Sequence, residues 1–148
     1  MNTDNLARFK QLLASHGHHV TRSRTQVFQL LNQSQPQSIR DILKLSNGSV
    51  DRVSLYRTIE LFENLGIIHR VHIGWKYKLE LTDHFVAHHH HLSCLKCGTI
   101  IDIEDGENIT SFIKDVVTKY DFSPVRHQFE IQGYCRSCNA LYPDPMIR

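Results

Sequence analysis

Apolar residues recur at helical spacing in four stretches of the first 65 residues, and each stretch is bounded by capping or turn-forming residues. Thr21 has the side chain and position of an N-cap, and Gly17 and Gly66 follow the last apolar residue of their stretches. The predicted helices span about residues 3–15, 21–32, 38–46 and 51–65.

The period changes after Gly66, where apolar and polar residues alternate through residues 67–81 around a turn at Gly74. Alternation on both sides of a glycine predicts a β-hairpin. Helices followed by a two-stranded hairpin are the order of a winged helix-turn-helix, with residues 51–65 as the recognition helix and the hairpin as the wing. Further along, the pattern predicts strands at 91–95, 99–103 and 125–133 and an amphipathic helix at about 107–120. We therefore expect a domain at 1–82, a hinge at 83–87 and a second domain at 88–148.

All four cysteines fall into two C-x-x-C pairs, Cys94 with Cys97 and Cys135 with Cys138. This is the ligand set of a closed, tetrahedral structural zinc site. The alternatives are a redox pair and a disulfide. A redox C-x-x-C stands at a helix start in a βαβ setting, which the flanking sequence does not offer.

Composition places few limits on function until the chain is divided. No apolar run approaches the roughly 18 residues of a membrane span, so we expect a cytoplasmic protein, where reducing buffers favour thiolate–metal ligation over disulfides. The net charge is +2, but residues 1–82 carry 11 Lys or Arg against 6 Asp or Glu, and residues 83–148 carry 6 against 9. The basic first half suits a polyanion, and the acidic half, with its cysteines and histidines, suits cations.

A helix reads DNA only if its exposed face carries groups that reach the edges of the bases. In the predicted recognition helix, Arg57 can bond a guanine edge through two hydrogen bonds, and Tyr56 can offer an apolar face to a thymine methyl. Arginines near the starts of the second and fourth helices are the expected phosphate contacts. The predicted DNA-binding residues are Arg22, Arg24, Arg52, Ser54, Tyr56, Arg57 and Thr58. A winged helix that assembles with other proteins is the alternative.

Five histidines lie within residues 84–91, and four of them are consecutive. In an extended strand His89 and His91 point to one face, while His88 and His90 point to the other, so one strand can supply two metal sites. Partners for these imidazoles are available at Glu80, Asp102, Glu104, Glu107 and His127. Imidazole and carboxylate together suit Zn²⁺ or Fe²⁺ in an exchangeable site. A surface histidine run without a specific role is the alternative.

Together these motifs resemble the ferric uptake regulator family, the metal-responsive bacterial repressors, over nearly the whole chain. The resemblance is carried by Val20-Thr21-x-x-Arg24, Ser54-Leu55-Tyr56-Arg57-Thr58, Leu65-Gly66-Ile67-Ile68, Glu80-Leu81-Thr82, the run from His88 to Gly98, and Cys135-x-x-Cys138. It implies an α+β homodimer with an N-terminal winged helix and a C-terminal α/β dimerisation domain. It also implies a structural four-cysteine zinc and one or two regulatory metals that permit binding to a DNA operator, expected to be palindromic and AT-rich.

The resemblance also implies which residues form the regulatory sites. The first falls on His69, Glu80, His89, His91 and Asp102. Iron-type members add a histidine just before the third helix, but residues 35–38 contain none, whereas His69 stands where zinc-type members have a ligand. The second site falls on His88, His90, Glu107 and His127, with His90 where many relatives have aspartate.

These considerations favour a zinc-responsive repressor of metal homeostasis genes. An iron-responsive or, less favoured, a peroxide-responsive member of the family is the alternative, and a zinc-buffering protein without DNA function is the alternative from another class. We do not expect an enzyme. The His-x-Glu and Pro-Cys-x-x-Cys signal of a zinc deaminase is absent from the sequence, and a four-sulfur site leaves no open coordination position.

Overall fold

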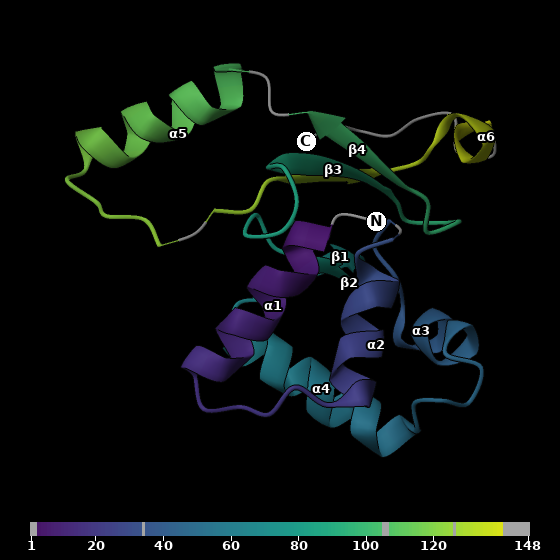
Figure 1. Ribbon diagram of the computed structural model, residues 1–148. Coiled ribbons are helices and arrows are strands. Elements are labelled where there is room, and N and C mark those ends of the chain that lie inside the picture. Colours follow the sequence, from purple (N-terminus) through teal and green to yellow (C-terminus); the bar gives the residue numbers. More distant parts are fainter. Residues whose placement is uncertain (1–2, 34, 105–106, 126, 141–148) are drawn as a thin grey trace. The chain divides into compact units, whose positions relative to one another are not determined.

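The computed structural model describes residues 3–33, 35–104, 107–125 and 127–140 (Figure 1). The chain divides into two compact units, residues 1–87 and 88–148, and each is described by itself. Within these described ranges, the first unit holds four helices and a hairpin, and the second holds a small sheet with two helices. Among the described residues, no helix has the length and apolar character needed to cross a membrane.

The helices of the first unit begin where their capping residues predict. Thr21 accepts a hydrogen bond from the amide of Arg24, and Ser38 and Asp41 form a reciprocal capping box. Asp51 accepts a hydrogen bond from the amide of Ser54. The helices are α1 (Thr3–Ser15), α2 (Arg22–Leu31), α3 (Ile39–Leu45) and α4 (Arg52–Asn64).

Aromatic rings form the centre of this unit's core. The rings of Phe9 and Phe28 stack with centroids 4.2 Å apart, and Phe62 of α4 meets Phe9 edge-on at 5.4 Å. All three side chains are fully buried. The predicted apolar faces of α1, α2 and α4 therefore converge on one core, which fixes α4 against the rest of the unit.

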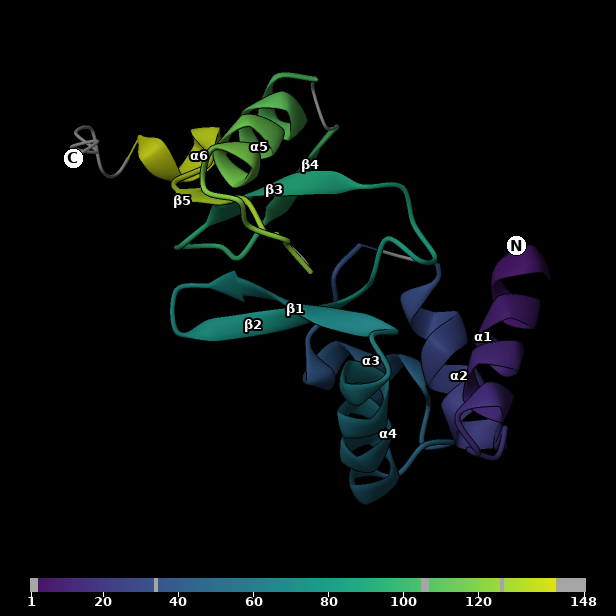
Figure 2. The ribbon, with the colours of Figure 1, turned by 90° about the vertical axis from the view of Figure 1, so that its left-hand side faces the viewer.

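A β-hairpin follows α4. Its strands β1 (Ile68–Ile73) and β2 (Lys76–Leu81) pair antiparallel from Ile68↔Leu81 to Ile73↔Lys76. Gly74 provides the positive φ of +58° that the two-residue turn requires. Figure 2 shows the hairpin extending past α4, with its turn on the side away from α1 and α2. This is the winged helix-turn-helix that the sequence predicts.

The stretch predicted as a hinge is mostly anchored to the first unit. The Thr82 hydroxyl donates to the Gly66 carbonyl at 2.7 Å, and the Asn5 side-chain amide donates to the Phe85 carbonyl at 2.8 Å. The Phe85 ring lies edge-on to Phe28, 5.1 Å between centroids, in the core. The chain is therefore held in this unit at least as far as Phe85.

The second unit is a three-stranded sheet in the order β4-β3-β5, antiparallel between β3 and β4 and parallel between β3 and β5. Its elements are β3 (His89–Cys94), β4 (Ile100–Glu104), α5 (Glu107–Lys119), β5 (Glu130–Gly133) and α6 (Arg136–Asn139). The last strand is shorter than the predicted 125–133, because it begins only where it pairs with His91. Figure 1 shows α5 beyond one end of the sheet.

Candidate metal centres and DNA-binding face

The two C-x-x-C pairs come together. Cys94 ends β3 and Cys97 lies in the turn that follows, while Cys135 caps α6 and Cys138 lies within it. All four Sγ atoms lie within 4.8 Å of one another, and no disulfide joins them. The Cys97 and Cys135 sulfurs are 3.7 Å apart. A tetrahedron with Zn–S distances of about 2.3 Å has edges of about 3.8 Å, so the residues fit the predicted structural zinc.

The protonation of the cysteines points to the same conclusion. The backbone amide of Cys135 donates to the Cys94 sulfur at 3.3 Å, and such hydrogen bonds lower the pKa of Cys94 to about 6. Burial raises the pKa of Cys138 to about 12. The Thr99 hydroxyl, 3.1 Å from the Cys97 sulfur, lowers the pKa of Cys97. Four sulfurs this close all become thiolates only beside a cation, which is what zinc supplies.

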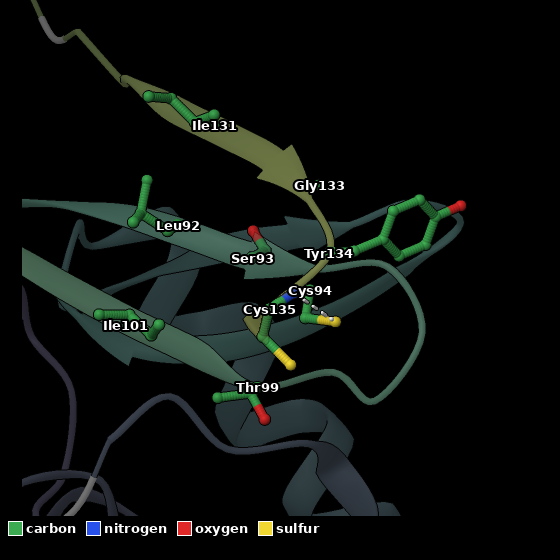
Figure 3. A pocket seen from close by; sticks show the side chains of 9 residues that line it. All are labelled: Leu92, Ser93, Cys94, Thr99, Ile101, Ile131, Gly133, Tyr134 and Cys135. Atoms are coloured by element: carbon green, nitrogen blue, oxygen red, sulfur yellow. Dashed lines mark hydrogen bonds between the residues drawn. The ribbon is translucent and has the colours of Figure 1, made fainter. Parts of the chain in front are cut away.

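A cavity of about 190 Å³ lies beside this centre on the three-stranded sheet (Figure 3). Figure 3 shows Leu92, Ile101 and Ile131 along its walls and the Cys94 and Cys135 sulfurs at one end. The complete lining is Leu92, Ser93, Cys94, Thr99, Ile101, Ile131, Gly133, Tyr134 and Cys135. The lining offers no carboxylate, imidazole or amine as a general base, so the cavity does not have the chemistry of a hydrolytic active site.

Three imidazoles form a second cluster within the second unit. His88 and His90 point to the same side of the chain entering β3, as the alternation predicts, and His127 meets them from the segment before β5. The Nε2 atoms of His88 and His127 are 3.0 Å apart, and one ring nitrogen of each of the three lies within 4.8 Å of the others. His90 is buried. The fourth predicted ligand, Glu107, begins α5, and its side chain lies outside the described residues.

The predicted ligands of the other regulatory site form one close group in each unit. In the hairpin, His69 and Glu80 are paired across the strands, with Nε2 of His69 3.4 Å from Oε2 of Glu80. In the sheet, the rings of His89 and His91 lie 4.7 Å apart, and Nε2 of His91 is 3.6 Å from Oδ1 of Asp102. These groups have the nitrogen and oxygen donors that Zn²⁺ and Fe²⁺ take.

One predicted DNA contact lies on the wrong face of α4. Thr58 is buried, and its hydroxyl donates to the Ser54 carbonyl at 2.7 Å. The 3.6-residue period explains this, because Thr58 follows Leu55 by three residues and so faces the core with it. The Thr58 side chain is therefore not available to contact DNA.

The exposed face of α4 carries Tyr56 and Arg57, as predicted, and the Arg52 guanidinium lies 5.8 Å from the centre of the Tyr56 ring. Val53, which the sequence reading missed, is 60% exposed on this same face. Helical spacing could have found it, because Val53 precedes Tyr56 and Arg57 by three and four residues. An exposed valine there offers a methyl contact of the kind a thymine accepts.

The remaining predicted contacts lie at the starts of α2 and α4. Arg22 is exposed at the start of α2. Arg24 is half-buried, and its guanidinium donates to the His19 carbonyl at 2.6 Å. Ser54 is half-buried in the first turn of α4. Arg22 is thus available to a phosphate as it stands, whereas Arg24 also holds the loop that precedes α2.

Comparison with known proteins decides the family. The model of the ferric uptake regulator family matches residues 15–132. The chain belongs to the ferric uptake regulator family. This confirms the resemblance drawn from the motifs, and with it the α+β fold of a winged helix followed by a metal-binding sheet domain.

Individual members of this family match most of the chain. The ferric uptake regulation protein of Vibrio cholerae is 31% identical over 143 residues, which cover 91% of this chain and 92% of that protein. The zinc uptake regulation protein of Mycobacterium tuberculosis is 29% identical over 106 residues, 70% of this chain and 78% of that protein. The crystal structure of the Vibrio cholerae ferric uptake regulator superposes with a TM-score of 0.70 at 27% identity, covering 86% of this chain and 99% of that one.

Membership of the ferric uptake regulator family makes this chain a metal-responsive, DNA-binding repressor and not an enzyme. Its relatives include both iron and zinc regulators, so family membership leaves the sensed metal open.

Proposed function

We propose that this regulator senses zinc and represses metal homeostasis genes as a homodimer in the cytoplasm. The observation that carries the proposal is the pairing of His69 with Glu80 at 3.4 Å in the wing hairpin. An imidazole at this place supplies a nitrogen ligand, and with His89 and His91 it completes a four-coordinate set of three nitrogens and a carboxylate. Such a set suits Zn²⁺, which prefers four ligands.

In this proposal one ion takes His69 and Glu80 from the first unit and His89 and His91 from the second. An ion bound by both units restricts how α4 is presented relative to the dimerisation domain. Two recognition helices must enter major grooves about one helical turn apart, or a multiple of it, so a restricted angle raises affinity for a palindromic, AT-rich operator. The metal supplies only this cross-link.

The surface of α5 supports dimerisation. Phe112 and Val116 of α5 are 67% and 39% exposed, and Tyr120, directly after the last residue of the helix, is 70% exposed. This side of the helix is therefore apolar and open to solvent within its own chain. Exposed apolar area of this kind is typical of a homodimer interface. A two-fold dimer would also match the two-fold symmetry of a palindrome.

Iron sensing is the second candidate, and one observation favours it. Asp102 lies 3.6 Å from His91 and offers a further oxygen ligand. A site that uses Asp102 in place of His69 has more oxygen donors and suits a six-coordinate Fe²⁺ better than a four-coordinate Zn²⁺.

The test compares operator binding at controlled free Zn²⁺ and, without oxygen, at controlled free Fe²⁺. Loss of a residue that hydrogen-bonds a metal ligand costs about 10- to 100-fold in metal affinity, so loss of a direct ligand should cost at least that much. His69→Ala should therefore raise the Zn²⁺ concentration needed for binding by about 100-fold, while Asp102→Ala has a smaller effect. The reverse ranking with Fe²⁺, together with a weak Zn²⁺ response of the wild type, would assign the site to iron.

The double variant His89→Ala, His91→Ala should remove metal-dependent operator binding and keep the four-cysteine zinc and the dimer. The matched control is His84→Ala, because His84 is an exposed imidazole near the same run that the proposal does not use. Zinc-dependent operator binding that survives in the double variant contradicts the proposed site. Wild-type zinc binding without any operator binding would instead indicate zinc buffering.

A further inference from the structure

The turn of the wing hairpin carries the chain's single tryptophan. Trp75 follows Gly74 between β1 and β2, and its side chain is fully exposed, at 104% of the reference area. Tryptophan is buried on average, because its ring removes 150–250 Å² from water when it finds a partner. A hairpin turn of this kind accommodates small polar residues readily, so the turn itself does not require an indole.

The hairpin holds Trp75 in a defined place relative to α4. The guanidinium of Arg70 in β1 donates hydrogen bonds to both carboxylate oxygens of Glu63 in α4, at 2.5 Å and 2.9 Å. The same guanidinium lies 4.4 Å from the centre of the Tyr77 ring in β2. Arg70 therefore links the recognition helix to both strands of the hairpin. A ligand that positions α4 also positions Trp75.

The charge around Trp75 has the sign that nucleic acid requires. From His72 to Lys78 the hairpin contains two lysines and a histidine and no carboxylate. The one carboxylate of the hairpin, Glu80, lies near its base, paired with His69. An apolar ring bordered by cations matches a groove of the duplex, where base edges lie between two rows of phosphates.

The reach of the hairpin also fits. Strands of six residues are about 20 Å long, and half a turn of B-DNA is about 17 Å along its axis. Figure 2 shows the turn lying beyond α4 and away from α1 and α2. The hairpin is therefore long enough to span the distance from a major groove to the neighbouring minor groove.

We propose that Trp75 is a DNA contact, placed against the minor groove next to the major groove that α4 occupies. Apolar side chains that enter a minor groove act as wedges or stacking surfaces, and the indole N–H can also donate to a base or sugar oxygen. The inference rests on the DNA-binding function of this regulator. It adds a second point of contact in each operator half-site.

Because Trp75 is the only tryptophan, its emission reports on this position alone. The metal-saturated protein is titrated with operator duplex, and binding is followed independently by the anisotropy of a dye on the duplex. We expect the tryptophan emission to shift or to be quenched in proportion to the bound fraction. Unchanged emission at full operator occupancy would overturn the proposal.

Two variants separate the aromatic contact from the charge. Trp75→Ala should weaken operator binding by about 5- to 30-fold, which corresponds to about 1–2 kcal/mol and is the scale of one lost apolar contact, with the salt dependence unchanged. Lys76→Ala should instead reduce the slope of log affinity against log salt by about one. Leu45→Ala, at a 51% exposed apolar residue of the same unit outside the hairpin, is the control and should bind like the wild type.

The remaining outcomes also decide the matter. If Trp75→Ala binds the operator as the wild type does, the indole makes no contact that contributes. If it changes the oligomeric state in sedimentation and leaves operator affinity per dimer unchanged, a second protein copy covers the ring. If the wild type binds no operator at any metal concentration, the DNA-binding function fails first, and this inference fails with it.

Discussion

Removal of two zinc ligands should unfold the second unit and spare the first. The change is the double substitution Cys135→Ser, Cys138→Ser, which leaves only one C-x-x-C pair. The cross-link between Cys97 and Cys135 closes a loop across 38 positions of the sequence. The chain-entropy relation for a cross-link gives about 4 kcal/mol of stabilisation for a loop of this length. A unit of roughly 60 residues rarely has more than about 3–5 kcal/mol in total, so the loss is comparable with its whole stability.

The assay is hydrogen exchange read by peptide, with the zinc content measured in parallel. Amides of β3, β4 and β5 should lose protection in the double variant, while α1, α2 and α4 exchange as in the wild type, because their core of stacked phenylalanines is independent of the metal. Ser137→Ala is the matched control, since Ser137 lies between the two cysteines in α6. Protection in β3 and zinc content equal to those of the control would refute a zinc-dependent fold of this unit.

The remaining predictions concern single positions. Arg57→Ala should weaken specific operator binding at saturating metal by about 1–3 kcal/mol, the cost of a lost bidentate guanine contact. Thr58→Val should leave operator binding unchanged, because that side chain is buried. Both affinities are measured by titration with labelled duplex. Ser38→Ala should destabilise the first unit by about 1 kcal/mol in urea unfolding, as expected for a lost N-cap. The Ser38 hydroxyl lowers the pKa of Asp41 in the folded state, so this carboxylate stabilises the fold above its ordinary pKa of about 4. Asp41→Asn should therefore cost stability at pH 7 and progressively less as the pH falls below that value. His127→Ala should reduce the metal bound per chain by one at most, measured by elemental analysis, and leave the four-cysteine zinc in place.

The winged helix could be predicted because its signals are local. Thr21, Ser38 and Asp51 cap helices through bonds to amides three residues away, and the hairpin is specified by alternation around Gly74. Capping and alternation depend on nearest neighbours in sequence, so they survive whatever the rest of the chain does. The same holds for the two faces of the histidine run.

Other features depended on contacts that no local pattern encodes. Asn5 bonds the Phe85 carbonyl across 80 positions of the sequence, so residues that look like a hinge are in fact part of the first unit. Thr58 is a different case, because a local pattern does encode its position. It follows Leu55 by three residues in α4, and this helical phase places it in the core although its hydroxyl is of a type that contacts DNA.

The anchoring of Phe85 in the first core leaves only a short segment before the histidine run. The histidine run begins at His88, only three residues after the last core side chain of the first unit. A tether this short keeps the ligands of the two units at a high effective concentration, on the order of millimolar for short linkers. Formation of the proposed regulatory site from ligands of both units would therefore cost little chain entropy, which would let it respond to a scarce ion.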